Sequence, residues 1–385
     1  MLMEYRKFGK LDLNVSALGF GCMRLPVVDG ESGKIDEPLA TAMLRKAIDQ
    51  GLNYVDTAWS YHLEHSEPFV GRVLKDGYRE KVFLATKMPS WLVKSQEDLE
   101  RLFTTQLERL QTDHFDFYLL HALNAGHWDN YLKVKVFDWA ERKLSAGQIR
   151  HLGFSFHDRY EVFKQILNGY DNWDFCQLQY NYMDVNEQAG RRGLLEAAEK
   201  GLGVIVMEPL RGGKLAAQNP PVQVAEAFSR SQRDWTMAEW ALQWLWNQPE
   251  ISVVLSGMSA MEQVEQNLQF ASRSGIGSLN ADDLATISRV QQAWSGLAPV
   301  PCTSCEYCMP CPNGVQIPRI FKLYNESVMY DRQGRGRNAY RNDFKDDQRA
   351  DMCIECGECE SLCPQNIPII QRLKDAHAYL TGENA

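Results

Sequence analysis

Eight short apolar runs, each followed by a longer amphipathic stretch, recur between about residues 15 and 295. The runs are rich in β-branched and aromatic residues, and an alternation of such runs with helical patterns is typical of a parallel sheet. The eight predicted strands span residues 17–21, 53–56, 82–87, 116–121, 151–155, 174–179, 204–208 and 252–255. Eight parallel strands are the number that closes a (β/α)8 TIM barrel, so we predict an α/β fold built on this barrel.

Helical patterns separate these strands, over residues 38–50, 96–110, 131–146, 186–200, 237–247 and 259–272. Several of them end at a glycine that can adopt the left-handed conformation of a helix stop: Gly51, Gly147 and Gly201. An open doubly wound sheet is the alternative, but it normally needs a G-x-G-x-x-G turn after the first strand, which this chain lacks. Residues 1–13 precede the first strand and are predicted to form a hairpin that closes the bottom of the barrel.

The sequence changes character after Pro299 and Pro301, where eight of the ten cysteines begin to appear. They form two runs, Cys302-x-x-Cys305-x-x-Cys308-x-x-Cys311-Pro312 and Cys353-x-x-Cys356-x-x-Cys359-x-x-x-Cys363-Pro364. The second run has the spacing of bacterial ferredoxins, in which a short loop places three thiolates on one cubane cluster. We therefore predict a barrel domain over residues 1–297 and a small, mainly helical, ferredoxin-like iron–sulfur domain over residues 298–385.

In two-cluster ferredoxins the fourth cysteine of each run binds the other cluster. By this rule one 4Fe-4S cluster would use Cys302, Cys305, Cys308 and Cys363, and the other would use Cys353, Cys356, Cys359 and Cys311. The first run has two residues instead of three before Cys311, so one cluster with a vestigial run is an alternative. A pair of zinc sites is another, although zinc usually takes its ligands from two separated cysteine pairs. Cys22 and Cys176 lie at strands and are expected to be buried apolar side chains.

Charge and hydropathy exclude several classes of function. A formal net charge of −9 argues against broad binding to nucleic acid or anionic membranes, both of which attract clustered positive charge. No run of about 18 apolar residues is present, so no membrane span is predicted. Clustered cysteines without a secretory signal indicate thiolate ligands in a reducing compartment, and we expect a cytoplasmic protein.

Polar residues end three successive predicted strands, at the edge where barrel enzymes carry their catalytic groups. Asp56, Lys87 and His121 close the second, third and fourth strands, and Tyr61 follows Asp56 by five residues. An ammonium beside a phenol favours the phenolate, so we expect Lys87 to lower the pKa of Tyr61. Each residue alone could be a cap, a strand end or a packing group, but their coincidence favours a catalytic site.

These motifs resemble those of the aldo-keto reductases, and the cysteine runs resemble the ferredoxin-tailed branch of that family. The matching segments are Asp56-Thr57-Ala58-Trp59-Ser60-Tyr61, Ser66-Glu67 with Gly71, Thr86-Lys87 and Leu119-Leu120-His121. The resemblance implies hydride transfer between NADP or NAD, bound across the barrel mouth, and a small carbonyl or alcohol substrate. Tyr61 would protonate the carbonyl oxygen, Lys87 and Asp56 would tune Tyr61, and His121 would position the substrate.

The same resemblance implies a set of cofactor contacts. Ser155 and Gln177 would bind the carboxamide, Met207 to Leu210 would lie at the nicotinamide ring, Arg211, Gly213 and Lys214 would bind the pyrophosphate, and Gly257, Ser259, Gln263 and Asn267 would bind the adenosine end. Gln263 occupies a position where the family commonly has an arginine for the 2′-phosphate, so both nicotinamide forms stay open. Trp91, His127 and Trp128 are candidates for the wall of the substrate pocket.

Two further functional readings stay open beside the enzyme. One is a non-catalytic nicotinamide-binding sensor, and the other is an electron-transfer subunit that uses the barrel as a scaffold. Iron–sulfur clusters pass single electrons whereas hydride carries two, and the sequence shows no flavin-binding signature to link them. The clusters are therefore expected either to be structural, to exchange electrons with a redox partner protein, or to serve a second bound cofactor.

Overall fold

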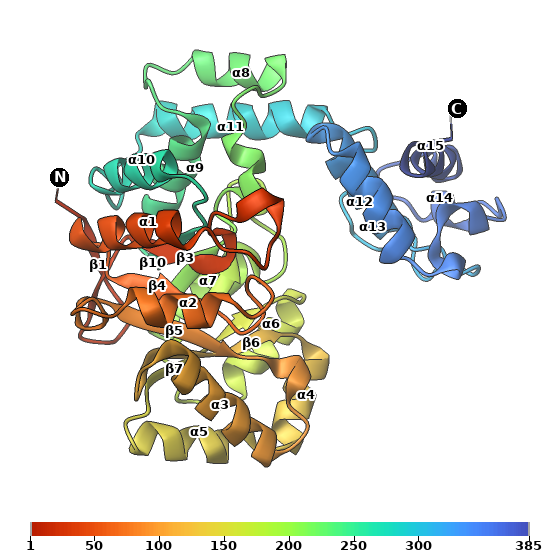
Figure 1. Ribbon diagram of the computed structural model, residues 1–385. Coiled ribbons are helices and arrows are strands. Elements are labelled where there is room, and N and C mark those ends of the chain that lie inside the picture. The colour runs from red at the N-terminus through yellow and green to blue at the C-terminus, as the bar shows by residue number, and fades with distance from the viewer. Residues whose placement is uncertain (1, 384–385) are drawn as a thin grey trace. The chain divides into compact units, whose positions relative to one another are not determined.

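The computed structural model describes residues 2–383, and many of its elements are labelled in Figure 1. The chain divides into two compact units. The first comprises the residues up to 218 together with 234–281, and the second comprises 219–233 together with the residues from 282 onward. The domain boundary expected between residues 297 and 298 stays a prediction.

A closed parallel barrel forms the centre of the first unit (Figure 1). Its strands are β3 (Leu18–Gly21), β4 (Tyr54–Asp56), β5 (Phe83–Met88), β6 (Phe115–Leu123), β7 (Ile149–Phe156), β8 (Phe175–Gln179), β9 (Gly203–Met207) and β10 (Ile251–Ser256). Each strand pairs in parallel with the next, and β10 pairs with β3 to close the ring. The predicted (β/α)8 TIM barrel is confirmed.

Helices follow the strands on the outside of the barrel: α1 (Glu37–Asp49), α2 (Ser66–Val73), α3 (Gln96–Leu110), α4 (Ala125–Lys133), α5 (Val136–Ser145), α6 (Tyr160–Asn168), α7 (Gly190–Glu199), α9 (Met237–Trp246) and α10 (Met261–Ala271). Several begin at a side chain that accepts a hydrogen bond from the backbone three residues on, as Asp36 does from Leu39 and Thr236 does from Glu239. The three predicted glycine stops all have positive φ.

The prediction of a single continuous helix over residues 131–146 is wrong. The chain instead forms α4 and α5, which are separated at Lys135, a residue with φ of 55°. The break serves tertiary packing, because Phe137 at the start of α5 stacks on Tyr170 with ring centroids 4.2 Å apart and meets Trp128 of α4 at 5.7 Å. Periodicity alone could not reveal it, since both halves keep an amphipathic pattern.

An antiparallel hairpin of β1 (Tyr5–Lys7) and β2 (Asn14–Ser16) precedes the barrel, close to the predicted one. Its loop inserts the fully buried Phe8 among the interior side chains, with Phe117 at 4.8 Å and Phe175 at 5.9 Å between ring centroids. Gly203 makes room for this ring, because a Cβ there would lie 2.3 Å from it. Since Phe175 and Gly203 begin their strands, Phe8 fills the amino end of the barrel, opposite the carboxyl ends that carry catalytic groups.

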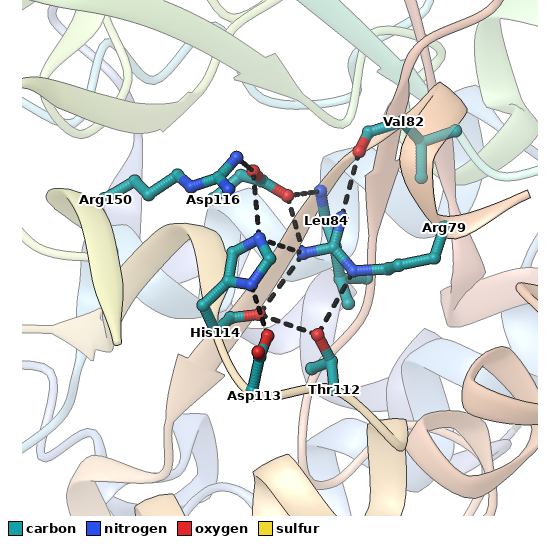
Figure 2. A network of polar contacts seen from close by, with 8 residues as sticks. All are labelled: Arg79, Val82, Leu84, Thr112, Asp113, His114, Asp116 and Arg150. Carbon is teal, nitrogen blue, oxygen red and sulfur yellow. Dashed lines mark hydrogen bonds and ion pairs between the residues drawn. The ribbon is translucent and has the colours of Figure 1, made fainter. Parts of the chain in front are cut away.

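A buried carboxylate ties three strands together at the same amino end (Figure 2). Asp116 is 1% exposed and accepts a hydrogen bond from the backbone N–H of Leu84 at 2.9 Å. It also pairs with Arg79 at 2.8 Å and with Arg150 at 2.7 Å. Arg79 continues the network to the carbonyl of His114 at 3.2 Å. The network lies away from the mouth of the barrel, so its role is structural.

Replacing Asp116 by asparagine is expected to lower the free energy of unfolding by about 3 kcal/mol, because it leaves the poorly exposed Arg79 without its buried counter-charge. The change is measured as the shift in urea unfolding followed by far-UV circular dichroism. Lys81→Gln, which breaks an ion pair about half exposed on both sides, is the control and should cost less than about 1 kcal/mol. Equal effects of the two substitutions would contradict the structural role.

The second unit is helical in its described part, as the sequence predicts for the C-terminal domain. Its helices are α8 (Val222–Ser229), α11 (Ala281–Gly296), α12 (Ile317–Met329), α13 (Gln333–Asn342), α14 (Glu358–Ser361) and α15 (Ile369–Thr381). Helices α12, α13 and α15 pack on one another around a small core that includes Ile320, Phe321 and Leu373. Cysteines of both runs pack against this core. Across residues 2–383, none of the helices has the length and apolar character needed to cross a bilayer.

Candidate active site and cysteine centre

A buried lysine joins three of the predicted catalytic residues. Lys87 on β5 is 1% exposed, and its Nζ lies 2.7 Å from both carboxylate oxygens of Asp56 at the end of β4. The same ammonium donates to the carbonyl of Thr57 at 2.8 Å and to the hydroxyl of Tyr61 at 3.3 Å. Polar groups on neighbouring segments thus fix the direction of the ammonium N–H donors of Lys87. One of these donors points at the hydroxyl of Tyr61.

His121 completes the group from the next strand. Its ring lies 6.2 Å from that of Tyr61, edge to face, and 5.2 Å from that of Trp91. The register of β6 against β7 shifts between Leu120 and Leu123. A β-bulge therefore bends this part of β6 and sets the direction of its side chains. Ala122 in the bulge has φ of 51°, and its N–H donates to Ser155 Oγ at 2.8 Å. The structure therefore brings all four predicted catalytic residues together.

Burial dominates the ionisation of the tyrosine. It raises the pKa of Tyr61, Lys87 opposes this rise, and Asp56 adds to it, so that the pKa stands above its ordinary value. The lysine acts in the predicted direction, but the expectation that the pKa falls is wrong, because desolvation of the phenolate outweighs one nearby cation. Burial alone would lower the pKa of Lys87, whereas Asp56 and Tyr61 raise it by more, which keeps the ammonium charged.

The histidine has the opposite shift. Burial lowers the pKa of His121 well below its ordinary range, and the charge of Lys87 acts in the same direction. The imidazole is therefore neutral near neutral pH. Its Nδ1 atom is buried without a hydrogen-bond partner among the described residues. A neutral ring can donate a hydrogen bond to a polar group of a substrate without adding a second cation beside Lys87.

A second layer of polar residues holds Lys87, and of these only Glu67 and Thr86 belong to the sequence motifs. Glu67 is fully buried and accepts hydrogen bonds from Thr86 Oγ1 and from Gln106 Nε2, both at 2.6 Å. Gln106 also donates to the carbonyl of Lys87 at 3.0 Å, and Arg109 pairs with Glu67 at 3.3 Å. Gln106 and Arg109 lie on α3, where polar residues look like an ordinary helix surface, so the sequence gives no signal for them.

The predicted carboxamide contacts lie side by side. Ser155 on β7 and Gln177 on β8 are register partners near the carboxyl ends of their strands, and both are buried. Gln177 Oε1 has no hydrogen-bond partner among the described residues. A buried acceptor without a donor is uncommon in proteins, and the amide of a nicotinamide could supply one. Ser155 accepts from Ala122 and can still donate its O–H. These residues fit the carboxamide of a nicotinamide.

The remaining predicted cofactor contacts are more dispersed. Met207 and Leu210 are half-buried at the end of β9 and after it, and Gly213 in the following turn is exposed with φ of 87°. Arg211 pairs with Asp184 at 3.0 Å, so its charge is already partly compensated. Lys214 and Gly257 lie in the loops after β9 and β10.

Two residues predicted to bind the adenosine end are held by neighbouring serines. Gln263 Oε1 accepts from the N–H of Ser259 at 2.8 Å, and Asn267 donates to Ser256 Oγ at 2.9 Å. The two differ in exposure, because Gln263 is exposed and Asn267 is buried. Only the Gln263 amide therefore faces solvent, where it could still exchange its serine contact for a ligand.

One of the three candidates for the pocket wall lies away from the site. Trp128 is 2% exposed and packs in the core outside the barrel, so the prediction is wrong for this residue. His127 donates from Nδ1 to the carbonyl of Ala122 at 2.8 Å, beside the bulge. Trp91 is 42% exposed and contacts His121, which fits the predicted position.

The cysteines of the second unit line two hollows. Cys302, Cys305, Cys308 and Cys363 line one of about 330 Å³, and Cys311, Cys353, Cys356 and Cys359 line another of about 450 Å³ in which Cys308 also takes part. The remaining lining is largely apolar, with Ile317 common to both. Among residues 2–383, no three His, Cys, Asp or Glu side chains converge on a point suited to a single metal ion. Four thiols around each apolar hollow are a donor set that fits a 4Fe-4S cluster.

A parallel eight-stranded barrel with a buried lysine–aspartate pair, a tyrosine and a histidine at its carboxyl edge has the organisation of a (β/α)8 enzyme. The family model described as "Aldo/keto reductase family" matches residues 17–291, and the chain belongs to this family. A model described as "4Fe-4S dicluster domain" matches residues 301–368. The enzyme class expected from the sequence, an NAD(P)-dependent oxidoreductase of the aldo-keto reductase type, is confirmed.

Relatives and solved structures match about three quarters of the chain. L-Galactose dehydrogenase from Arabidopsis thaliana is 29% identical over 75% of this chain and 93% of that protein. A holo-form aldo-keto reductase from Bacillus halodurans is 27% identical, with a TM-score of 0.63 over 75% of this chain and 96% of its own. An aldo/keto reductase from Klebsiella pneumoniae in complex with NADP and acetate is 25% identical, with a TM-score of 0.59 over 75% and 96% of the two chains.

Proposed function

We propose that the barrel transfers a hydride between a nicotinamide cofactor and a small carbonyl or alcohol substrate at the site formed by Asp56, Tyr61, Lys87 and His121. The observation that carries the proposal is the position of Lys87 Nζ, 2.7 Å from the Asp56 carboxylate and 3.3 Å from the Tyr61 hydroxyl. This contact gives the tyrosine a fixed positive charge at the point where its own negative charge develops.

Each residue has one task in carbonyl reduction. Tyr61 donates its hydroxyl proton to the carbonyl oxygen, and its raised pKa keeps that proton available at neutral pH. Lys87 stabilises the phenolate left behind, and Asp56 keeps Lys87 charged and aimed. His121 donates a hydrogen bond that orients the carbonyl. Alcohol oxidation uses the same groups in reverse, with the phenolate as the base.

Bound at the mouth, NADP or NAD supplies or accepts the hydride. Ser155 and Gln177 would hold the carboxamide, and the unpartnered Oε1 of Gln177 supports this assignment. Met207 and Leu210 would lie at the ring, Arg211, Gly213 and Lys214 at the pyrophosphate, and Gly257, Ser259, Gln263 and Asn267 at the adenosine end. Because Gln263 is uncharged, it favours neither nicotinamide form through charge.

The C-terminal cysteines are proposed to bind two 4Fe-4S clusters, with the fourth cysteine of each run crossing to the other cluster. The grouping of thiols around the two hollows supports this pairing. Thiolate ligands persist in a reducing compartment, which supports a cytoplasmic location. Anaerobic addition of reduced nicotinamide tests an electron-transfer role: bleaching of the cluster absorbance supports it, and its absence leaves the clusters with a structural role or a separate redox partner protein.

The cofactor assignment predicts a specific loss on changing Gln177. Gln177→Ala should weaken nicotinamide binding by about tenfold, the value of one hydrogen bond to a buried acceptor. Binding is measured by fluorescence titration with NADH and NADPH. Gln148→Ala, which changes a glutamine just before β7 at the opposite end of the barrel, should leave both affinities unchanged.

A turnover assay decides between the enzyme and its alternatives. The wild-type protein is incubated anaerobically with either reduced nicotinamide and a panel of small aldehydes and ketones. For the reverse reaction, the protein is incubated with L-galactose and either NAD or NADP. L-Galactose is chosen because one relative is named L-galactose dehydrogenase. Nicotinamide binding without turnover of any carbonyl or alcohol would leave the sensor as the better reading.

A further inference from the structure

The turn that follows Tyr61 has an unusual backbone. His62, Leu63 and Glu64 are three consecutive residues with φ of 51°, 52° and 72°. None of them is glycine, and side chains disfavour this left-handed region because of steric conflict with the backbone. Such conformations persist only where surrounding contacts enforce them, and they gather at functional sites.

Both ring nitrogens of His62 bind the backbone of another loop. The side chain is buried, its Nε2 lies 3.1 Å from the N–H of Leu25, and its Nδ1 lies 2.8 Å from the carbonyl of Ser32. A carbonyl can only accept, so Nδ1 must carry the hydrogen, and Nε2 must be bare to accept from Leu25. The two contacts therefore require the neutral ring in one tautomer.

The loop that His62 grips belongs to the same edge of the barrel as the active site. Leu25 and Ser32 follow β3, whose carboxyl end lies beside that of β4. The turn itself is closed by the N–H of Ser66 donating to the carbonyl of Tyr61 at 3.2 Å. Thr57 and Ser66 are joined at 2.8 Å between their hydroxyls. Tyr61 is thus held between a strand end and a turn that His62 fastens.

We propose that His62 is a positioning residue for Tyr61, and that its neutral imidazole, clamped between Leu25 and Ser32, holds the left-handed turn in the form that aims the Tyr61 hydroxyl. Protonation of Nε2 replaces the acceptor of the Leu25 N–H by a second donor, so the clamp opens in acid. This inference rests on the role proposed for Tyr61 and adds a pH-dependent support to it.

Most of the surroundings of His62 lower its pKa. Burial has the largest effect and lowers it, whereas the hydrogen bond to the Ser32 carbonyl raises it. The charges of Arg24 in the loop and His65 in the turn lower it further. A group with a pKa below its unfolded value contributes stability above that unfolded value and loses it as pH falls through the folded pKa. The turn should therefore be firm at neutral pH and loosen in acid, before His121, whose pKa lies well below the ordinary range, is protonated.

The test compares pH profiles of carbonyl reduction. In the wild-type enzyme kcat should fall as pH drops below the ordinary histidine range, with KM and nicotinamide affinity nearly unchanged, because Tyr61 is misplaced while the binding residues are not. His62→Gln cannot titrate, so this acidic limb should disappear and kcat at neutral pH should fall by about tenfold through loss of one backbone contact. Rescue of the neutral-pH kcat by His62→Asn relative to His62→Ala would add support.

Hydrogen exchange supplies a second readout that does not depend on turnover. A peptide covering residues 22–36 should gain deuterium in the wild type on acidification, after correction for the intrinsic rate, and should be equally fast at both pH values in His62→Ala. His65→Gln is the matched control, because this exposed histidine lies in the same turn. It should leave kcat at neutral pH unchanged and keep both the acidic limb and the acid-induced exchange, moved to slightly higher pH because His65 no longer lowers the pKa of His62.

Failures of the inference and of the proposed function are distinguishable. If Tyr61→Phe abolishes carbonyl reduction but His62→Gln keeps the wild-type kcat and acidic limb, the clamp is overturned and the catalytic assignment stands. If Tyr61→Phe retains activity, the proposed function fails whatever His62 does. A destabilised His62→Ala protein, identified by its melting curve, leaves His62→Gln as the deciding variant.

Discussion

Replacing Tyr61 by phenylalanine is expected to lower kcat for carbonyl reduction by about 10²–10⁴-fold, the usual contribution of a positioned general acid. The substitution removes one hydroxyl that Lys87 contacts at 3.3 Å and leaves the lysine paired with Asp56. Nicotinamide affinity should be unchanged, because Tyr61 is not among the residues assigned to the cofactor. The loss is measured as single-turnover oxidation of reduced nicotinamide with a saturating aldehyde.

The barrel offers a matched control for this substitution. Tyr54 lies on β4, two residues before Asp56, and its buried hydroxyl has no hydrogen-bond partner among the described residues. Tyr54→Phe removes the same atom from the strand that precedes the turn of Tyr61, at no cost in hydrogen bonds, so kcat and the melting temperature should not fall. Comparable activity of the two variants would remove the basis for Tyr61 as the acid.

The pH dependence of the wild-type reaction follows from the raised pKa of Tyr61. Reduction needs the protonated phenol, so it should persist through neutral pH and decline only above the ordinary tyrosine range. Oxidation needs the phenolate and should accelerate over that same rise in pH. Because Lys87 lowers the pKa of Tyr61, these limbs depend on the lysine charge as well as on burial.

The strands and the grouping of the four candidate catalytic residues could be predicted from sequence because both leave local signals. A buried parallel strand is a short apolar run, and a catalytic residue at its carboxyl end interrupts that run at a fixed place, as Asp56 and Lys87 do. The segment 131–146 shows the limit of this reasoning. Its break at Lys135 depends on Tyr170, a residue distant in sequence, so local periodicity could not show it.

The support of the site was harder to predict for the same reason. Glu67 belongs to a motif, but its partners Gln106 and Arg109 come from another helix, and nothing in the polar face of that helix distinguishes them. His62 is one histidine among eight in the sequence. Its role depends on backbone angles and on two backbone partners that lie 37 and 30 residues earlier in the sequence, at Leu25 and Ser32. The net pKa of Tyr61 likewise depends on burial, which sequence spacing does not report.

Iron content should reveal how the eight clustered cysteines are shared. With two 4Fe-4S clusters the anaerobically purified protein should contain about eight iron and eight sulfide per chain, whereas zinc sites would contain no sulfide. Cys305 and Cys356 line different hollows, so Cys305→Ala and Cys356→Ala should each lower the content to about four iron per chain. Cys176→Ala, at a fully buried cysteine of the barrel, should change nothing.

Double variants separate crossed from sequential sharing. If Cys363 crosses to the first cluster, Cys305→Ala with Cys363→Ala removes two ligands of one cluster and should retain about four iron per chain. Cys305→Ala with Cys311→Ala then removes one ligand from each cluster and should lose nearly all iron. If each run held its own cluster, the two double variants would exchange results. Iron and sulfide quantitation, with the broad visible absorbance of the clusters, therefore reads out the pairing that the two hollows support.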